Sequence, residues 1–283
     1  ELKDDVTTTT LFQDPGAWAI LDWSPDSTKL LLLQFRSIHD SNLYIIDRET
    51  GVKAPFDAAI SKGGYVKAKF SPNNRGVYYV SNLDGEFLKL FYKPYSGPRH
   101  QISDDTPWNI VDFDISADQN ILAYTVNNGG ILELVVKRLS NGENLFTTDL
   151  PKGQISRLQI SPDGQHLGFT LNSARSGQGV YALNLTNGAI LQWSGSRPYD
   201  QAVAPEVIHF PTFDRVKRSS STAKREIPAH IYKPNTPGPH PVIIRFHGGP
   251  ESQWVAGYSD ATQYWVQALN VAVIKPNIRG STG

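Results

Sequence analysis

Two glycine-containing loops hold the residues of this sequence that are best placed to do chemistry. His247-Gly248-Gly249-Pro250 follows the apolar run Val242–Phe246, and Asn277–Gly283 follows a second apolar run, Val271–Ile274. Glycines let a backbone approach a reacting group closely, so its N–H groups can stabilise negative charge that develops on oxygen. Open α/β sheets place their chemistry at the carboxyl ends of such strands.

The sequence gives little support for a thiol, metal or nucleotide-binding site. The chain has no cysteine, which excludes a thiol nucleophile, a zinc ribbon and a disulfide framework. Its seven histidines stand singly, without the spacing of a metal site, and no phosphate-binding glycine motif is present. We therefore expect no metal and no cofactor. Gly257-Tyr258-Ser259-Asp260-Ala261 lacks the second glycine of a nucleophile elbow and follows a loop, so Ser259 is rejected as a nucleophile.

Length and charge narrow the class of protein. The chain has 283 residues, enough for about two domains, with 27 basic and 27 acidic side chains and a formal net charge of zero. That balance gives no electrostatic argument for binding nucleic acid or an anionic membrane. No apolar run approaches the ~18 residues that a membrane span needs. We expect a soluble protein.

One tripeptide recurs along the first two hundred residues. Ser24-Pro25-Asp26 returns as Ser71-Pro72-Asn73, Ser116-Ala117-Asp118 and Ser161-Pro162-Asp163, at intervals of 45 to 47 residues. Each copy ends an alternating run and precedes two β-rich runs, a glycine turn and a weaker fourth run. Four short strands in about 45 residues is the period of a β-propeller blade. An ordinary β-sandwich with coincidental turns is the alternative.

The predicted fold is therefore mainly β, with four recognisable four-stranded blades over residues 1–200. The weaker fourth strands include Glu143–Thr148 and Ala189–Trp193. Thr7–Phe12 resembles a surplus outer strand, which indicates that these blades are part of a larger or opened propeller.

Residues 201–283 follow a different pattern. Val207–Phe210 and Ile227–Tyr232 are strand-like and flank a polar, basic loop, Asp214–Arg225. Val242–Phe246 and Val271–Ile274 indicate buried parallel strands, and Ala261–Leu269 between them can form a helix with Tyr264, Trp265 and Ala268 along one side. Strand, loop, helix and strand in this order predict the beginning of an α/β domain.

Blades followed by this α/β opening resemble the prolyl oligopeptidase family of serine peptidases, most closely its bacterial acylaminoacyl-peptidase-like and dipeptidyl-peptidase-like members. Three segments carry the resemblance: Pro211–Asp214 with Arg225–Ala229, His247–Gln253, and Asn277–Gly283. The resemblance implies an α/β-hydrolase domain with a Ser, Asp and His triad, and a propeller that gates access for short peptides. A bacterial cytoplasmic, periplasmic or secreted location is compatible with it.

The resemblance also assigns roles to residues of this chain. It implies an oxyanion-hole region at His247, Gly248 and Gly249, and a site-shaping loop that includes Pro250, Arg279 and Gly280. His247 stands where some relatives carry a tyrosine, which favours backbone donation here. Alternatively, Gly-Gly-Pro is only a tight turn and His247 a packed residue. We expect Arg279 to be a structural anchor that binds carbonyls or a carboxylate.

The triad itself is expected beyond Gly283, so the hydrolase domain is expected to be truncated before its nucleophile and the chain to be inactive alone. The function predicted is that of a serine-type exo- or oligopeptidase using acyl-enzyme chemistry. The alternative is a β-propeller scaffold that binds proteins without catalysis. Expected partners are short peptides, with association between copies of the chain at an uncovered sheet edge, and neither nucleic acid nor membrane.

Overall fold

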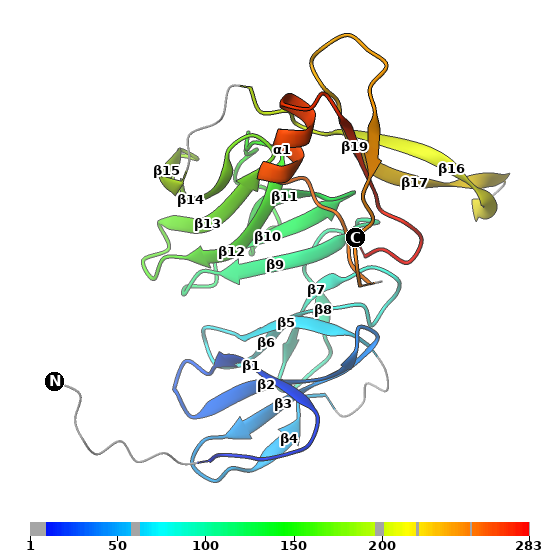
Figure 1. The fold of residues 1–283 in the computed structure, drawn as a ribbon. Helices are drawn as coiled ribbons and strands as arrows, with labels where there is room; N and C mark the ends of the chain where they lie inside the picture. Colours follow the sequence, from blue (N-terminus) through cyan, green and yellow to red (C-terminus); the bar gives the residue numbers. More distant parts are fainter. Residues whose placement is uncertain (1–9, 58–62, 196–200, 219–220, 250, 283) are drawn as a thin grey trace. The chain divides into compact units, whose positions relative to one another are not determined.

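The structure is a computed structural model that describes residues 10–57, 63–195, 201–218, 221–249 and 251–282. The regular secondary structure of the described chain is β-strand, apart from a single α-helix (Figure 1). It divides into two compact units, residues 1–110 and residues 111–283. The division falls between the second and third repeats, and the domain boundary near residue 200 stays a prediction.

The first unit contains two four-stranded antiparallel sheets, with their strands in chain order. Their strands are β1 (Ala17–Trp23), β2 (Lys29–Ser37), β3 (Asp40–Asp47), β4 (Lys53–Pro55), β5 (Tyr65–Phe70), β6 (Gly76–Ser81), β7 (Lys89–Pro94) and β8 (His100–Gln101).

The second unit contains a three-stranded antiparallel sheet, whose first strand begins at the unit boundary, and two four-stranded sheets. The strands of the third and fourth repeats are β9 (Asn109–Ile115), β10 (Ile121–Asn128), β11 (Ile131–Arg138), β12 (Gly153–Ile160), β13 (His166–Ser173), β14 (Gly177–Asn184) and β15 (Ile190–Gly195). The C-terminal sheet consists of β16 (Glu206–Arg218), β17 (Ser221–Tyr232), β18 (Val242–Ile244) and β19 (Ala272–Pro276), with α1 (Asp260–Gln267) between β18 and β19 in the chain.

The recurring serine closes the turn between the first two strands of each repeat. Ser24 Oγ donates to Asp26 Oδ1 (2.6 Å) and accepts from the N–H of Lys29 (2.8 Å). Ser71, Ser116 and Ser161 make the equivalent contacts in their own repeats. Hydrogen bonds from the serine hydroxyl and from the turn lower the pKa of Asp26, Asp118 and Asp163. The repeated tripeptide therefore forms a turn in which its own side chains accept hydrogen bonds from the backbone N–H groups of the turn.

Carboxylates on first strands bind the next sheet within each unit. Asp22 Oδ2 accepts from the N–H of Phe70 (2.8 Å), and Asp114 Oδ2 accepts from the N–H of Ile160 (2.6 Å). Both aspartates stand two residues before the repeat serine, and both donors stand one residue before the next serine. The same repeat position thus joins the first sheet to the second and the third sheet to the fourth.

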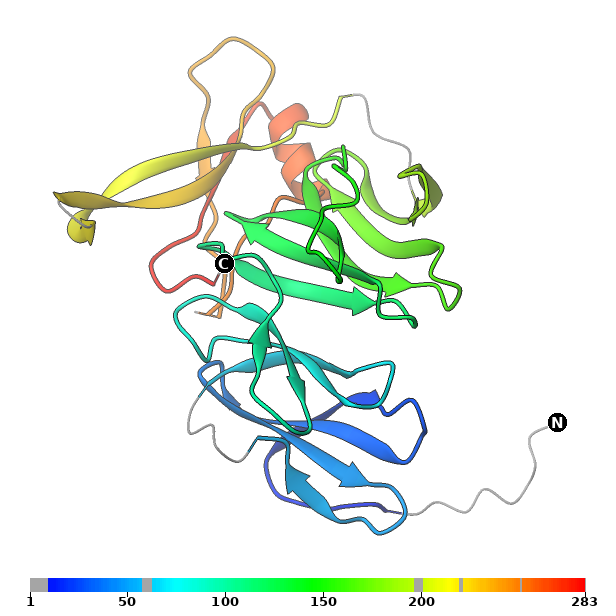
Figure 2. The ribbon, with the colours of Figure 1, turned by 180° about the vertical axis from the view of Figure 1, so that it is seen from behind.

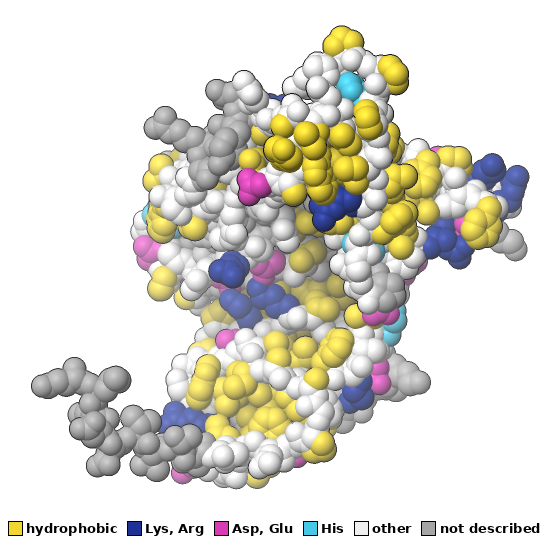
Figure 3. All heavy atoms as spheres, in the orientation of Figure 1, with side chains coloured by type: hydrophobic (Ala, Val, Ile, Leu, Met, Phe, Trp, Pro, Cys, Tyr) yellow, Lys and Arg dark blue, Asp and Glu magenta, His cyan; other side chains and the backbone are white. Residues whose placement is uncertain are grey.

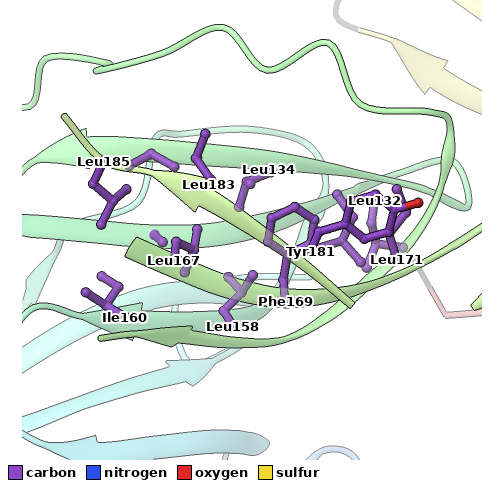
Figure 4. Close-up of a cluster of buried hydrophobic side chains, with 13 residues drawn as sticks. Leu132, Leu134, Leu158, Ile160, Leu167, Phe169, Leu171, Tyr181, Leu183 and Leu185 are labelled. Atoms are coloured by element: carbon purple, nitrogen blue, oxygen red, sulfur yellow. The ribbon is translucent and has the colours of Figure 1, made fainter. Parts of the chain in front are cut away.

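Apolar side chains fill the space between the sheets of the third and fourth repeats. Figure 4 shows them converging from the facing strands. The cluster includes Leu132, Leu134, Leu158, Ile160, Leu167, Phe169, Leu171, Tyr181, Leu183 and Leu185. Because both faces of a blade-like sheet pack on neighbours, its middle strands are apolar on both sides. The four repeats thus form four antiparallel sheets, and their closure into a propeller stays a prediction.

Three expectations about strands are wrong. Glu143–Thr148 forms no strand: only an isolated bridge joins Asn144 to Lys137, while Leu145 and Phe146 pack against the cluster of Figure 4. Residues 10–12 of the expected strand Thr7–Phe12 are not in a strand either, because Leu11 and Phe12 pack on the first sheet; residues 7–9 lie outside the described residues.

The third error is the polar segment Asp214–Arg225, which is mostly strand and not a loop. Its residues extend β16 and β17 into a long hairpin with a register shift between Pro211 and Arg215. Backbone pairing continues beyond the apolar part of each strand, so the polar residues were wrongly predicted to be a loop.

The C-terminal sheet has the order β16-β17-β19-β18, with β18 parallel to β19. Figures 1 and 2 both show α1 beside this sheet, and Val266 of α1 packs with Tyr232 and Val273. The strand predicted at Val271–Ile274 is buried as expected. No helix in the described part of the chain is long and apolar enough to cross a membrane.

The predicted burial of the strand within Val242–Phe246 is wrong. Val242 is 52% and Ile244 56% exposed, because β18 is the edge strand of its sheet. Tyr264 of α1 is also 59% exposed, and the buried helix side consists of Thr262, Gln263 and Val266. Figure 3 shows apolar side chains gathered on this part of the surface.

Candidate active site

The two glycine-containing loops leave the same edge of the C-terminal sheet. β18 and β19 are parallel, and the N–H of Arg245 donates to the carbonyl of Ile274 (2.9 Å) directly beyond the last paired residue of β18. The loop after Arg245 and the loop after Pro276 therefore both begin at the carboxyl ends of parallel strands. This is the placement expected for chemistry in an open α/β sheet.

Gly248 and Gly249 present backbone N–H groups without an acceptor among the described residues. Both glycines are exposed. A Cβ on Gly248 would meet nothing within 4 Å, whereas one on Gly249 would lie 2.8 Å from the amide nitrogen of Glu251, at a φ of +140°. Gly249 is therefore required by its own loop, and the space beside Gly248 is open to another molecule.

His247 contacts the second loop. Its Nε2 lies 2.7 Å from Ser281 Oγ, and Ser281 Oγ lies 2.6 Å from the carbonyl oxygen of Ile278. The single hydroxyl hydrogen of Ser281 can go to only one of these acceptors. His247 Nδ1 lies 3.0 Å from the carbonyl oxygen of Gly248, and no carboxylate of the described residues is bonded to the imidazole. The pair thus joins the two loops and lacks the acidic member of a catalytic triad.

Arg279 binds a carboxylate, as expected of an anchor. Its guanidinium lies 3.2 Å from Asp214 Oδ2, which also accepts from Arg225 Nε (3.2 Å). Hydrogen bonds from Thr212 and Arg225 and the nearby charge of Arg279 lower the pKa of Asp214. Gly280 has a φ of +86°, which favours glycine, and Pro250 lies outside the described residues. Arg279 therefore connects the second loop to the β16–β17 hairpin.

A side-chain amide that the sequence analysis missed clamps the loop between β18 and α1. Asn277 is buried; its Oδ1 accepts from the N–H of Trp254 (2.7 Å) and its Nδ2 donates to the carbonyl of Trp254 (3.0 Å). Trp254 Nε1 donates to the carbonyl of Arg245 (3.0 Å), and the N–H of Thr282 donates to the carbonyl of Ser252 (2.9 Å). The two loops are thus held as one structure.

The same loop is bonded to the hairpins of the third and fourth repeats. The N–H of Ala256 donates to the carbonyl of Gly130 (2.8 Å), and Asn127 Nδ2 donates to Gln253 Oε1 (2.6 Å). Asn172 Oδ1 accepts from the N–H of Tyr258 (3.1 Å). Within the second unit, the loop that begins at Gly248 is therefore supported from both sides.

Cations and aromatic rings alternate beneath this loop. Arg245 lies over the rings of Trp254 and Trp265, and Lys275 lies over those of Tyr232 and Trp254, at 4.7 to 5.2 Å from the ring centroids. Burial, with a smaller effect of Arg245, lowers the pKa of Lys275 to about 8. Burial also lowers the pKa of His230, whose Nδ1 has no partner among the described residues. No local sequence pattern marks this layer.

Ser259 is the N-cap of α1. Its Oγ accepts from the N–H of Thr262, which is a structural task and agrees with its rejection as a nucleophile. No group of three or more His, Asp or Glu side chains that could hold a metal ion occurs in the described segments.

No protein-family model matches this chain, and no curated protein matches its sequence. Solved structures do match its fold. Puromycin hydrolase superposes with a TM-score of 0.74 at 19% identity, covering 93% of this chain and 41% of that one. A puromycin-hydrolyzing peptidase of Mycobacterium tuberculosis gives 0.73 at 15% identity, with 96% and 42% covered. Prolyl oligopeptidase B from Galerina marginata gives 0.74 at 14% identity, with 96% and 40% covered.

The chain has the fold of prolyl oligopeptidase-family peptidases. The predicted resemblance is confirmed at this level, since 93 to 96% of the chain is covered by each of these superpositions. The chain spans about two fifths of the length of these proteins.

Proposed function

We propose that this chain provides the propeller and the oxyanion-binding side of a serine peptidase of the prolyl oligopeptidase family. The observation that supports this most directly is that the N–H groups of Gly248 and Gly249, at the carboxyl edge of two parallel strands, have no acceptor among the described residues. The shared fold with peptidases supports it independently.

The proposed reaction is acyl transfer. A serine hydroxyl attacks a peptide carbonyl, and the oxygen of the tetrahedral intermediate accepts hydrogen bonds from the cradle at His247, Gly248 and Gly249. Removing one such donor typically lowers kcat by about 10²–10³. The Ser, Asp and His of the triad would come from residues that follow Gly283, in that chain order.

The substrates proposed are short peptides. Sheets of the repeats, placed ahead of the hydrolase domain in the chain, would restrict access to the site by size. Under this proposal the 283-residue chain is inactive alone, since neither Ser259 nor Ser281 has the oriented base of a catalytic serine.

A fluorophosphonate probe tests the proposal. The polypeptide that extends beyond Gly283 should be labelled on one serine and should hydrolyse short peptide amides, and the 283-residue chain should not be labelled. Absence of labelling in both would favour the scaffold alternative, and labelling of the 283-residue chain would refute the placement of the nucleophile.

A matched pair of variants in the longer polypeptide tests the cradle. Gly248→Pro removes one N–H group and should lower kcat by about 10²–10³. Gly248→Ala keeps the N–H group, and its Cβ meets no atom within 4 Å, so it should retain most activity. Equal activity of the two variants would refute a role for this N–H group.

A further inference from the structure

A cavity lies within the second unit. It has a volume of about 270 Å³ and is lined by Ile131, Pro151, Lys152, Ser173, Ala174, Arg175, Ala204, Pro205 and Ala256. Its lining is mainly apolar, and none of the described residues that line it is acidic. The volume is just below the ~300–1,000 Å³ of typical small-molecule sites, so it suits one or two amino-acid residues.

The walls of this cavity are held by hydrogen bonds between distant segments. Gln263 of α1 bonds both the N–H and the carbonyl of Val203 (2.9 Å each) and lies 3.5 Å from the carbonyl of Ala174. Ala256 is bonded to the carbonyl of Gly130 (2.8 Å). Ala174 and Ala256 are almost fully buried. The cavity is therefore part of the packed structure of this unit.

Two cations line the cavity. Lys152 and Arg175 are exposed, and neither side chain has an ion pair or hydrogen bond with any described residue. Gly153 pairs with Ser173, and the N–H of Ala174 donates to the carbonyl of Lys152 (3.4 Å), so Lys152 stands opposite Ala174, the residue directly before Arg175. An ammonium and a guanidinium together suit a carboxylate, which accepts from both.

We propose that this cavity binds the free C-terminal carboxylate of a short peptide, with Lys152 and Arg175 holding the carboxylate and the apolar floor receiving a small terminal side chain. Ala256 belongs to the loop between β18 and α1, which also contains Gly248 and Gly249, so this loop contributes to both the cavity and the proposed oxyanion cradle. The assignment of a peptide substrate to this cavity rests on the proposed function. The existence of a carboxylate-binding site there does not depend on that function.

Binding to the 283-residue chain tests the proposal without any catalysis. Tri-alanine with a free carboxylate should bind, and tri-alanine amide should bind at least about tenfold more weakly, because it lacks the charge that the two cations would pair with. Arg175→Gln and Lys152→Gln should each weaken binding of the acid about tenfold and leave binding of the amide unchanged. Lys224→Gln, a change of an exposed cation outside the cavity, is the matched control.

A third variant separates the floor from the charges. Ala204→Leu fills the apolar space while it keeps both cations, so it should weaken binding of the acid and the amide alike; circular dichroism and the thermal midpoint would verify its folding. Equal binding of acid and amide, or acetate binding as tightly as tri-alanine, would overturn the proposal. The two proposals can fail separately. If the chain binds tri-alanine through its carboxylate but the longer polypeptide is not labelled by the fluorophosphonate, the proposed function is refuted and the binding site is not.

Discussion

The clamp between Asn277 and Trp254 offers the sharpest test of how the candidate site is held. Asn277 is 5% exposed, and its amide makes two hydrogen bonds, of 2.7 and 3.0 Å, to the backbone of Trp254. Asn277→Ala removes the side-chain amide, so the N–H and the carbonyl of Trp254 each lose a hydrogen-bond partner. A buried polar group that loses its partner costs about 1–3 kcal/mol.

Trp254 is only half-buried, so water can reach part of its backbone once the amide is gone. We therefore expect a loss of about 2–3 kcal/mol in the free energy that opens the loop between Gly249 and Ser259, which corresponds to about 30- to 150-fold faster local exchange. Native-state hydrogen exchange at the amides of Trp254 and Ala256 measures this directly.

Two further variants isolate the cause. Asn277→Asp keeps an acceptor for the N–H of Trp254 and loses the donor to its carbonyl, so exchange at Trp254 should rise less than in Asn277→Ala. Asn235→Ala, in an exposed turn of the same unit, should leave exchange in the loop unchanged. Unchanged protection of the Trp254 amide in Asn277→Ala would refute the reasoning.

Three other predictions concern stability. Burial lowers the pKa of Lys275 from 10.5 to about 8, so the charged amine destabilises the fold by about 3 kcal/mol below pH 8, and this cost disappears by pH 10.5. The stability gained by Lys275→Met, measured by urea unfolding, should therefore shrink as the pH rises from 8 to 10. A gain that stays constant over this range would contradict the prediction. Ser116→Ala removes the hydroxyl that closes its turn and should lower the free energy of unfolding by about 1–3 kcal/mol. Urea unfolding of the second unit measures this loss, and an unchanged midpoint would contradict it. Arg279→Gln should cost less than about 1 kcal/mol in the same measurement, since its ion pair with Asp214 is exposed; a larger loss would show that the second loop depends on this contact.

The repeat could be predicted because its determinants are local. Ser116, for example, bonds to groups two and five residues away, so the turn is specified by a short stretch of chain. The strands on either side alternate or are apolar over their own length. The parallel strands after residue 240 and the helix between them also follow from periodicity, and with them the position of both glycine loops.

The contacts that shape the candidate site could not be predicted in the same way. Asn277 and Trp254 are 23 residues apart, and His247 and Ser281 are 34 residues apart. No spacing rule relates such pairs, because the distance between them depends on how β18 and β19 pair. Lys152 and Arg175, which have no ion pair among the described residues, come to line one cavity only because the ends of β12 and β13 lie side by side.

The sequence alone determined the period of the sheets, the order of strand, loop, helix and strand, and the glycines that can approach a reacting oxygen. Only the tertiary structure decided that Val242 and Ile244 lie on an exposed edge, that Glu143–Thr148 forms no fourth strand, and that one buried amide joins the two loops. The reason is physical: propensity and turn chemistry act within a few residues, whereas burial depends on which distant segment packs against each face.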